Sequence, residues 1–447
     1  MMLRPRMRQR VPDAAPRPGR PPRWHGVAIV VFILLVTGAL GLIDRLVYGS
    51  WEGKTGSKIT QALNILLIAI ALRLFATGWV RERRLLPGEG MALGLTGFLI
   101  LSALWSIDPA TSLRRGVLYL FFVIGAIGIA RVCEADRFMR LVRLACLICA
   151  AGSLALLAAY PSAAVMMGSA AQEVQGVFTH KNVLGQAMAV GALACLHGMR
   201  TTRRPGAWPY VALLLIMAVA LLSKSATACL TIFAFCAISL GVVLYRRGGI
   251  ARMAATGAAV IGAPVGLVII IDPSGVLELI GKDPTLTGRT ELWAAVFDNI
   301  AQRPFLGWGL GAFWLASNPA GEAISDSLGW VVPHAHNGIL EMLLEVGVFG
   351  TAFFLLIWTR TVAMAVRLIG SPARDLAVTA LMACGGFVLI GATEIVLLDH
   401  TQALITVFYV TGFMCERTLR LRARSLRASR RAAGPVGYSQ RQPWVGG

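Results

Sequence analysis

The chain has few charged residues, and acidic ones are the scarcer kind. Only 14% of its 447 residues are Asp, Glu, Lys or Arg, whereas 56% are hydrophobic. A soluble domain carries about a quarter charged residues, so this composition argues against one. The apolar runs also lack the two-residue alternation of outer-membrane barrel strands, and lipid favours helices over open strands. We therefore predict an all-α protein.

Sequence signals for disulfides and metals are missing as well. Eight cysteines lie in or beside apolar runs, and the largest polar segment, residues 272–336, contains none, which argues against a disulfide framework. Cys146 and Cys149 form a C-x-x-C inside an apolar run, where small-residue packing outweighs redox chemistry. No H-E-x-x-H motif or dense carboxylate cluster accompanies the histidines. We therefore expect neither a metal site nor a cofactor.

Long apolar runs are what the chain has instead, and about twelve of them are long enough to cross roughly 30 Å of hydrocarbon as helices. They cover residues 27–43, 59–80, 91–106, 113–130, 139–160, 182–199, 207–222, 226–245, 253–271, 337–359, 376–396 and 401–416. The predicted protein is a polytopic membrane protein with one membrane domain, residues 27–416. Basic tails, residues 1–26 and 417–447, flank it and should be disordered near anionic head groups.

The distribution of positive charge predicts the orientation in the membrane. When the loops are assigned alternately to the two sides, 31 of the 42 Lys and Arg residues fall on the side of the N-terminus. This bias places both termini in the cytoplasm, and the polar segment 272–336, between spans 9 and 10, on the opposite side of the membrane. The net charge of +20 follows loops rather than one face, so no nucleic-acid partner is expected.

The predicted outer loop has internal order. Thr290–Ile300 has the spacing of an amphipathic helix, which begins at a threonine cap and ends before Arg303-Pro304. Phe305–Trp314 then interleaves glycines with aromatic residues. Such a segment suits an interfacial anchor or a wall for a lipid or sugar ligand, and the pattern leaves both interpretations open.

Several polar residues are predicted beside membrane helices on the outer side, namely His180, Lys181, Lys224, Arg289, His334 and His336. Cations together with a histidine are what a pyrophosphate-bearing substrate requires. Each group also has a structural interpretation. His180 and Lys181 can extend from a helix end to the membrane interface. Lys224, in a short turn, can be a surface residue, and Arg289 can neutralise Glu291.

A helix from Asn337 would place Glu341 and Glu345 on the same face, descending into the bilayer. At 1.5 Å per residue, Glu345 would lie roughly 12 Å below Asn337 and should face the interior of the bundle. Such buried carboxylates are functional candidates, although pairing with Arg73 is an alternative. Glu394 belongs to a further polar group at the outer end of a span.

The motifs in their order resemble the O-antigen ligase and polymerase superfamily, and most closely the exopolysaccharide polymerases of the ExoQ type. His336-Asn337, nine residues, Gly347, two residues and Gly350 match the H-N-x9-G-x-x-G pattern of the ligases and their relatives. Phe178–Gly185 is similar to an F-x-H-K-N-x-L-G element, Thr287–Trp293 to a loop motif, and Gly307–Gly309 to a following G-x-G turn.

The resemblance implies glycosyl transfer on the outer face of the membrane, from an undecaprenyl-pyrophosphate-linked glycan to a second sugar, without nucleotide sugar or metal. On this basis His336 is the general base and Arg289 stabilises the pyrophosphate leaving group, so that the anomeric centre inverts. Lys224 stands where the ligases tend to carry an arginine. The remaining residues predicted to bind substrate are His180, Lys181, His334, Asn337 and Glu341.

The preferred function is polymerisation of lipid-linked repeat units in exopolysaccharide or O-antigen biosynthesis. A ligase that transfers finished glycan to lipid A core or protein is one alternative, because the motifs do not specify the acceptor. A solute transporter is another, and Arg73, Glu345 and Glu394 would support it if they lined one channel. A flippase and a chain-length regulator are the expected protein partners of a polymerase.

Overall fold

A computed structural model describes residues 23–43, 57–166, 172–202, 204–250, 252, 289–395 and 402–432. Within these ranges every regular element is a helix, and the only β pairing is a single bridge between Val165 and Val174. Eight of the described helices are long and apolar enough to cross a membrane. The prediction of an all-α polytopic membrane protein is therefore confirmed. The predicted span 253–271 lies outside the described residues, so the total of about twelve spans remains a prediction.

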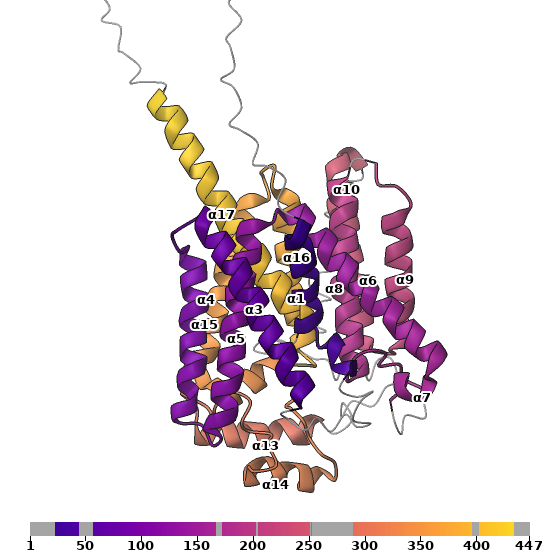
Figure 1. Ribbon diagram of the computed structural model, residues 1–447, viewed down its shortest axis with the longest axis vertical. Helices are drawn as coiled ribbons and strands as arrows, with labels where there is room; N and C mark the ends of the chain where they lie inside the picture. Colours follow the sequence, from indigo (N-terminus) through magenta and orange to yellow (C-terminus); the bar gives the residue numbers. More distant parts are fainter. Residues whose placement is uncertain are drawn as a thin grey trace, which may run out of the picture.

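The helices of the bundle run roughly along the long axis of the molecule, and several are tilted from it (Figure 1). They are α1 (Arg23–Val36), α3 (Lys58–Arg81), α4 (Pro87–Leu101), α5 (Pro109–Val132), α6 (Ala135–Ala159), α8 (Lys181–Thr201), α9 (Trp208–Leu222), α10 (Ala226–Arg247), α15 (Gly338–Leu368), α16 (Arg374–Gly391) and α17 (Ala403–Ala432). The remaining helices are η1 (Ala39–Gly41), η2 (Ser102–Leu104), α7 (Pro161–Ala164), α13 (Arg289–Gln302) and α14 (Pro319–Leu328). The last two lie at one end of the bundle (Figure 1).

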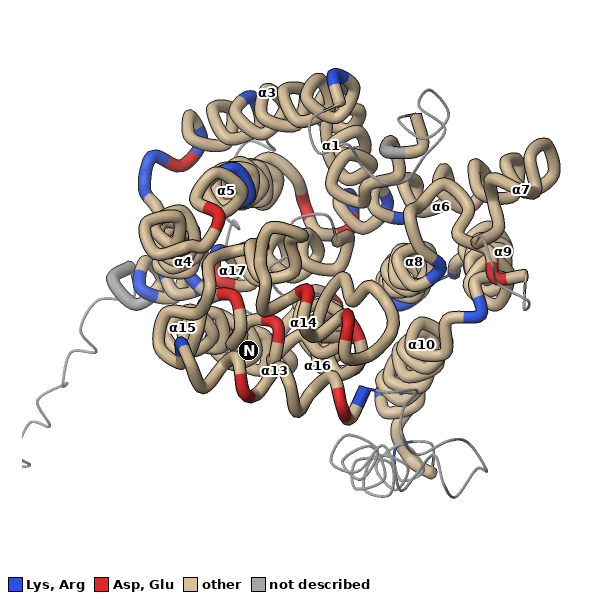
Figure 2. Tube along the Cα trace, turned by 90° about the horizontal axis from the view of Figure 1, so that it is seen from below, with Lys and Arg blue, Asp and Glu red and all other residues tan. Residues whose placement is uncertain are grey.

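Small residues allow the helices to approach one another closely. A Cβ atom at Gly128 of α5 would lie 2.6 Å from the backbone of Leu74 in α3, and one at Gly125 would lie 2.4 Å from the ring of Phe32 in α1. Helices in lipid usually associate by close backbone approach, because apolar side chains gain little free energy by moving from lipid into a helix interface. Viewed from the α13 end, α3, α4, α5 and α15 lie on one side and α8, α9 and α10 on the other (Figure 2).

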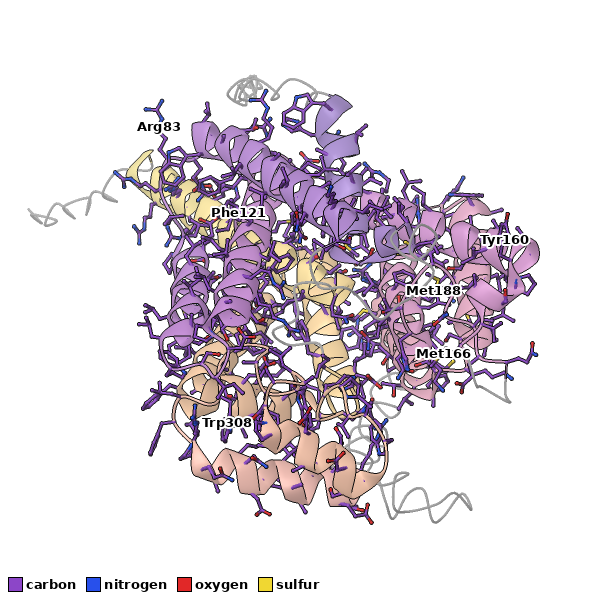
Figure 3. The ribbon with its side chains drawn as sticks, turned by 60° about the horizontal axis from the view of Figure 1, so that its bottom comes forward. Arg83, Phe121, Tyr160, Met166, Met188 and Trp308 are labelled. Atoms are coloured by element: carbon purple, nitrogen blue, oxygen red, sulfur yellow. The ribbon has the colours of Figure 1, made fainter. Side chains whose placement is uncertain are left out.

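The arginine-rich loops meet at the end of the bundle opposite α13. Figure 3 shows Arg83 at one end and Trp308 at the other. The Arg131 guanidinium forms a buried ion pair with Glu89, and it also donates to the carbonyl oxygen of Glu82 at 2.7 Å. Arg417 donates to the carbonyl oxygen of Arg131 at 3.0 Å. These contacts agree with the alternating assignment of loops, whereas the side of the membrane on which they lie remains a prediction.

The expected disorder of the C-terminal tail is wrong for its first part. Helix α17 continues through residues 417–432 and projects beyond the bundle (Figure 1). Arginine, leucine and alanine dominate this stretch, and all three have high helix propensity, so the helix continues after its packing partners end. Residues 433–447 lie outside the described part of the chain.

Helix α15 is interrupted at Gly347, whose φ of 62° and ψ of −169° are not helical. The segment Pro304–Gly309 docks at this break. Val348 N–H donates to the carbonyl oxygen of Pro304 at 2.8 Å, and Trp308 N–H donates to that of Leu344 at 2.9 Å. Because a backbone group in lipid needs a partner, the docked segment satisfies what the break releases. Gly347 of the predicted motif therefore lies where a membrane helix meets residues 289–337, which form the outer segment.

Candidate active site

The segment His334–Asn337 is fixed from both ends. Asn337 caps α15, since its side-chain oxygen accepts from Ile339 N–H at 3.0 Å and from Leu340 N–H at 3.2 Å. The indole Nε1–H of Trp293 in α13 donates to the carbonyl oxygen of Ala335 at 2.9 Å. The predicted amphipathic helix is confirmed as α13, and its buried face bears Leu292 and Val296. Its first residue is Arg289, one position earlier than the expected threonine cap.

His336 has a left-handed backbone conformation, with φ of +49°. Residues with a side chain rarely adopt it, and holding one there costs about 1–3 kcal/mol. His334 helps to hold the turn, because its Nδ1 accepts from the backbone N–H of His336 at 3.1 Å. The two rings lie 4.0 Å apart between centroids. Strain of this kind, maintained by the surroundings, is typical of functional sites.

Glu394, three residues beyond the end of α16, is the centre of the polar cluster. Its Oε1 accepts from the side-chain amide of Asn182 at 2.5 Å and lies 3.9 Å from Nδ1 of His336. Its Oε2 lies 3.9 Å from Nε2 of His334. One carboxylate therefore links the start of α8, the end of α16 and the loop before α15. The side chain of Glu394 is only 8% exposed, so these contacts are weakly screened by water.

His180 and Lys181 lie at the start of α8, beside this carboxylate. The Nδ1 atom of His180 accepts from Asn182 N–H at 3.2 Å and caps the helix. Burial lowers the pKa of His180, against the opposing charge of Glu394. Lys181 forms an ion pair with Glu173, so part of its charge is already neutralised. The helix cap by His180 and the ion pair of Lys181 thus favour the structural interpretation, in which both residues lie at a helix end at the membrane interface.

Arg289 begins α13 and is partly buried. Burial lowers its pKa from the usual value near 12.5, and the negative charge of Glu394 opposes the change. A guanidinium remains protonated at any physiological pH despite such a shift. Arg289 therefore brings a permanent positive charge to the Glu394 cluster.

His334 and Glu394 have shifted pKa values that fix their charges at neutral pH. Burial, with the neighbouring His336, lowers the pKa of His334 to about 4. Burial alone would raise the pKa of Glu394, but His336, His334 and Arg289 together outweigh it, so the pKa lies below its usual value. At neutral pH His334 is uncharged, whereas Glu394 is ionised.

Lys224 lies in the turn between α9 and α10, where its φ of +55° is also left-handed. Its side chain is exposed. Three residues later, the hydroxyl of Thr227 hydrogen-bonds that of Thr393 at 2.8 Å, next to Glu394. The turn is thus tied to the rim of the cluster through Thr227 and Thr393, and substrate binding by Lys224 stays a prediction.

Glu341 lies behind the histidine loop. Its Oε2 accepts from the backbone N–H of Ala335 at 2.7 Å, and its Oε1 accepts from the indole N–H of Trp314 at 3.0 Å. Glu345, one turn further, is 6% exposed and accepts from Gly311 N–H at 2.9 Å. The prediction that Glu345 faces the interior is confirmed, and Glu341 on the same face is buried as well. Their contacts give them the role of supports for the outer segment, and substrate binding by Glu341 stays a prediction.

Trp308 and Phe305 of the segment 305–314 lie in different surroundings. The Trp308 side chain is buried, and its indole donates to the carbonyl oxygen of Asn299 at 3.0 Å. Phe305 is 61% exposed and stacks on Phe349. The tryptophan therefore belongs to the packing of the outer segment, while the exposed phenylalanine keeps the position of an interfacial anchor.

Three ligand atoms, from His334, His336 and Glu394, lie within 4.8 Å of one another, which is a spacing that can hold a metal ion. The charge of Arg289 opposes a cation in the same cluster. This geometry does not decide between a metal-bound and a metal-free site, so the metal-free site stays a prediction.

The residues that would support transport lie in three different surroundings. Arg73 is exposed on α3 and stacks over Trp24 at 5.1 Å. Glu345 is bound to the backbone of Gly311 and Glu394 to the histidine cluster. Arg73, on an exposed face of α3, therefore does not share a buried path with Glu345 and Glu394, which as whole residues are each 6% exposed.

Two contributors to the cluster were not assigned to the site from the sequence. Glu394 was noted only as part of a polar group near the end of a span, and the other members of that group, Asp399 and His400, lie outside the described residues. Asn182 was quoted only within the F-x-H-K-N motif. The available signal for Glu394 was an ionisable residue at the end of a span. Its partners in the cluster could not be inferred locally, because they lie more than fifty residues away in sequence.

Comparisons with known proteins agree with the resemblance that the sequence motifs indicate. Residues 209–355 match the family model described as O-antigen ligase. The chain is also similar to the exopolysaccharide production protein ExoQ of Rhizobium meliloti (strain 1021), with 28% identity over 289 residues. That match covers 58% of this chain and 63% of the relative, so it spans less than two thirds of the relative's length. The predicted resemblance to O-antigen ligases and ExoQ-type proteins is confirmed.

Proposed function

We propose that this protein is a glycosyltransferase of the bacterial inner membrane that joins lipid-linked repeat units into a longer polysaccharide outside the cytoplasm. The observation that carries the proposal is the convergence of His336, His334, Arg289 and Glu394 at the end of the bundle opposite the arginine-rich loops. Similarity to an O-antigen ligase model and to a protein of exopolysaccharide production supports the same class of chemistry.

In the proposed reaction His336 is the general base. It takes the proton of an acceptor hydroxyl, whose oxygen then forms a bond to the anomeric carbon of the donor sugar. The bond between that carbon and the pyrophosphate oxygen breaks, and its electron pair leaves with undecaprenyl pyrophosphate. Attack opposite the leaving group inverts the anomeric centre. The reaction as written needs neither a metal ion nor a nucleotide sugar.

The leaving group gains negative charge as the bond breaks, and Arg289 is proposed to stabilise it. Arginine suits this role because its planar guanidinium binds phosphate oxygens in a bidentate manner. Lys224 would add a compact positive charge from the α9–α10 turn. His180, Lys181, His334 and Asn337 are the further candidates for positioning donor and acceptor.

Polymerisation is preferred because the similar protein is described by its part in exopolysaccharide production. The second candidate is a ligase, which the description of the matching family model favours. The two reactions share the donor and differ in the acceptor. As a polymerase the protein would act after a flippase has delivered the lipid-linked unit and together with a chain-length regulator. Both termini would lie in the cytoplasm.

The proposal is tested by sizing lipid-linked glycans in a strain that lacks the protein. The strain is complemented with wild type, His336→Ala, Arg289→Ala or the control Glu322→Gln, which changes an exposed carboxylate of α14. A polymerase predicts that single repeat units accumulate with the first two variants and not with the control. Long untransferred chains would indicate a ligase instead. Unchanged glycans with altered solute uptake would contradict both.

A further inference from the structure

The three histidines of the cluster differ in what their Nδ1 atoms meet. In His180 and His334 this atom accepts a backbone N–H, from Asn182 at 3.2 Å and from His336 at 3.1 Å. A backbone amide only donates, so both Nδ1 atoms must offer a lone pair. A neutral imidazole has a single proton, and both rings therefore carry it on Nε2. For His334 this places an N–H on the side of Glu394, with Nε2 and Oε2 3.9 Å apart.

His336 has the opposite arrangement. Its Nδ1 is buried and makes no hydrogen bond among the described residues, although it lies 3.9 Å from Oε1 of Glu394. A lone pair at this nitrogen would face the lone pairs of an ionised carboxylate and would be repelled. A proton there would instead be attracted to the negative charge, in surroundings that screen it little.

Glu394 is held in place independently of His336. Its Oε1 accepts from the amide of Asn182 at 2.5 Å, and the adjoining Thr393 hydroxyl is joined to Thr227 of α10 at 2.8 Å. The groups whose charges act on Glu394 are His334, His336 and Arg289, and Glu394 in turn acts on His180. The carboxylate is thus the fixed partner, and the histidine ring adapts to it.

We propose that Glu394 is a positioning residue that fixes His336 in the Nδ1–H tautomer and thereby makes Nε2 the atom that receives the acceptor hydroxyl proton. The proposal rests on the proposed function, because it specifies how the general base of that reaction is prepared. When Nε2 takes the proton, the ring becomes an imidazolium with N–H groups at both nitrogens, and Glu394 stabilises its charge. The 3.9 Å separation is longer than a hydrogen bond, as catalytic contacts often are before substrate binds.

The kinetic test compares Glu394→Gln, Glu394→Asp and the control Glu322→Gln in purified protein with a lipid-linked repeat unit. Loss of the charge should lower kcat on the order of 10²–10⁴-fold and change KM little, because the base is then held in the wrong tautomer. Aspartate should recover part of the rate, and the control should match wild type. A KM effect with unchanged kcat, or full activity of Glu394→Gln, would overturn the proposal.

The spectroscopic test does not depend on turnover. Protein labelled with ¹⁵N-histidine is compared with His336→Gln to assign the signals of the His336 ring. Wild type should show a protonated Nδ1 and an unprotonated Nε2, whereas Glu394→Gln should show a mixture or the reverse. A wild-type ring protonated on Nε2 overturns the inference. Wild type with the expected tautomer but without glycosyl transfer would contradict the proposed function and leave only the effect of Glu394 on the His336 tautomer standing.

Discussion

Replacing Gly347 with alanine should detach the outer segment from helix α15. The glycine has φ of 62° and ψ of −169°, and a Cβ atom added to it would lie 2.3 Å from the carbonyl carbon of Phe305. Neither backbone can yield easily, because the segment Pro304–Gly309 fills the break in the helix. Alanine would therefore favour a continuous helix, from which the docked segment is excluded.

The magnitude follows from two contributions. A residue with a side chain costs about 1–3 kcal/mol in this backbone region. Separating the segments also loses the hydrogen bonds that Val348 and Phe349 donate to it, and those that Trp308 and Gly309 donate to α15. Each contributes a net stabilisation of about 0.5–1.5 kcal/mol. Taken together, these contributions predict that Gly347→Ala lowers the free energy of unfolding by about 3–9 kcal/mol.

Unfolding in mixed micelles, followed by tryptophan fluorescence, measures this change, because Trp308 lies in the docked segment. Gly97→Ala is the matched control, since a Cβ at this position of α4 meets open space and alanine favours a helix. The control should be as stable as wild type or slightly more so. If Gly347→Ala unfolds within about 1 kcal/mol of wild type, the docked break does not stabilise the protein and the reasoning fails.

Three further predictions concern the loop, its acid sensitivity and the opposite end. Glu341→Ala leaves Ala335 N–H and the Trp314 indole N–H without their acceptor. The free energy of unfolding should therefore fall by about 1–3 kcal/mol, and the rate of glycan transfer should fall with it. Wild-type stability together with a wild-type transfer rate would contradict the supporting role of Glu341. Burial lowers the pKa of His334 to about 4 against 6.5 for a free histidine, so the unfolded chain takes up the proton first. Stability should therefore be complete above pH 6.5 and decline by about 3 kcal/mol as the pH falls to 4. Chemical unfolding across this range checks it, and His334→Gln should remove that part of the decline; an unchanged profile would refute the assignment. Arg131→Ala leaves the buried Glu89 unpaired and should cost about 3–5 kcal/mol in the same unfolding assay, whereas a neutral result would mean that water reaches this end.

Hydropathy and short motifs were sufficient to predict the membrane helices and α13, because both signals are local in sequence. The spacing of Leu292 and Val296 in α13 gave the face that is buried. Helix α14 was not predicted, although Asn318 before Pro319 and Gly329 after Leu328 are start and stop signals. The tail from Arg417 was assigned to disorder on charge alone, against the helix propensity of its residues.

The site required long-range information that no local pattern contains. His336 and Arg289 were predicted from motifs, but their relation to Glu394 depends on how α16 packs against α8 and α15. Gly347 was identified as a motif residue without its physical reason, which is the docking of Pro304–Gly309 into the break. Left-handed conformations at His336 and Lys224 are likewise imposed by surroundings that only the folded structure contains.

The most direct test of the proposed reaction uses purified protein, a lipid-linked repeat unit as donor and acceptor, and the pair wild type and His336→Gln. Release of undecaprenyl pyrophosphate and the length of the glycan product are measured together. Wild type should release one pyrophosphate lipid for each sugar bond formed, while His336→Gln should bind the donor but lose at least about a hundredfold in rate. Equal rates for the two proteins would contradict His336 as the general base.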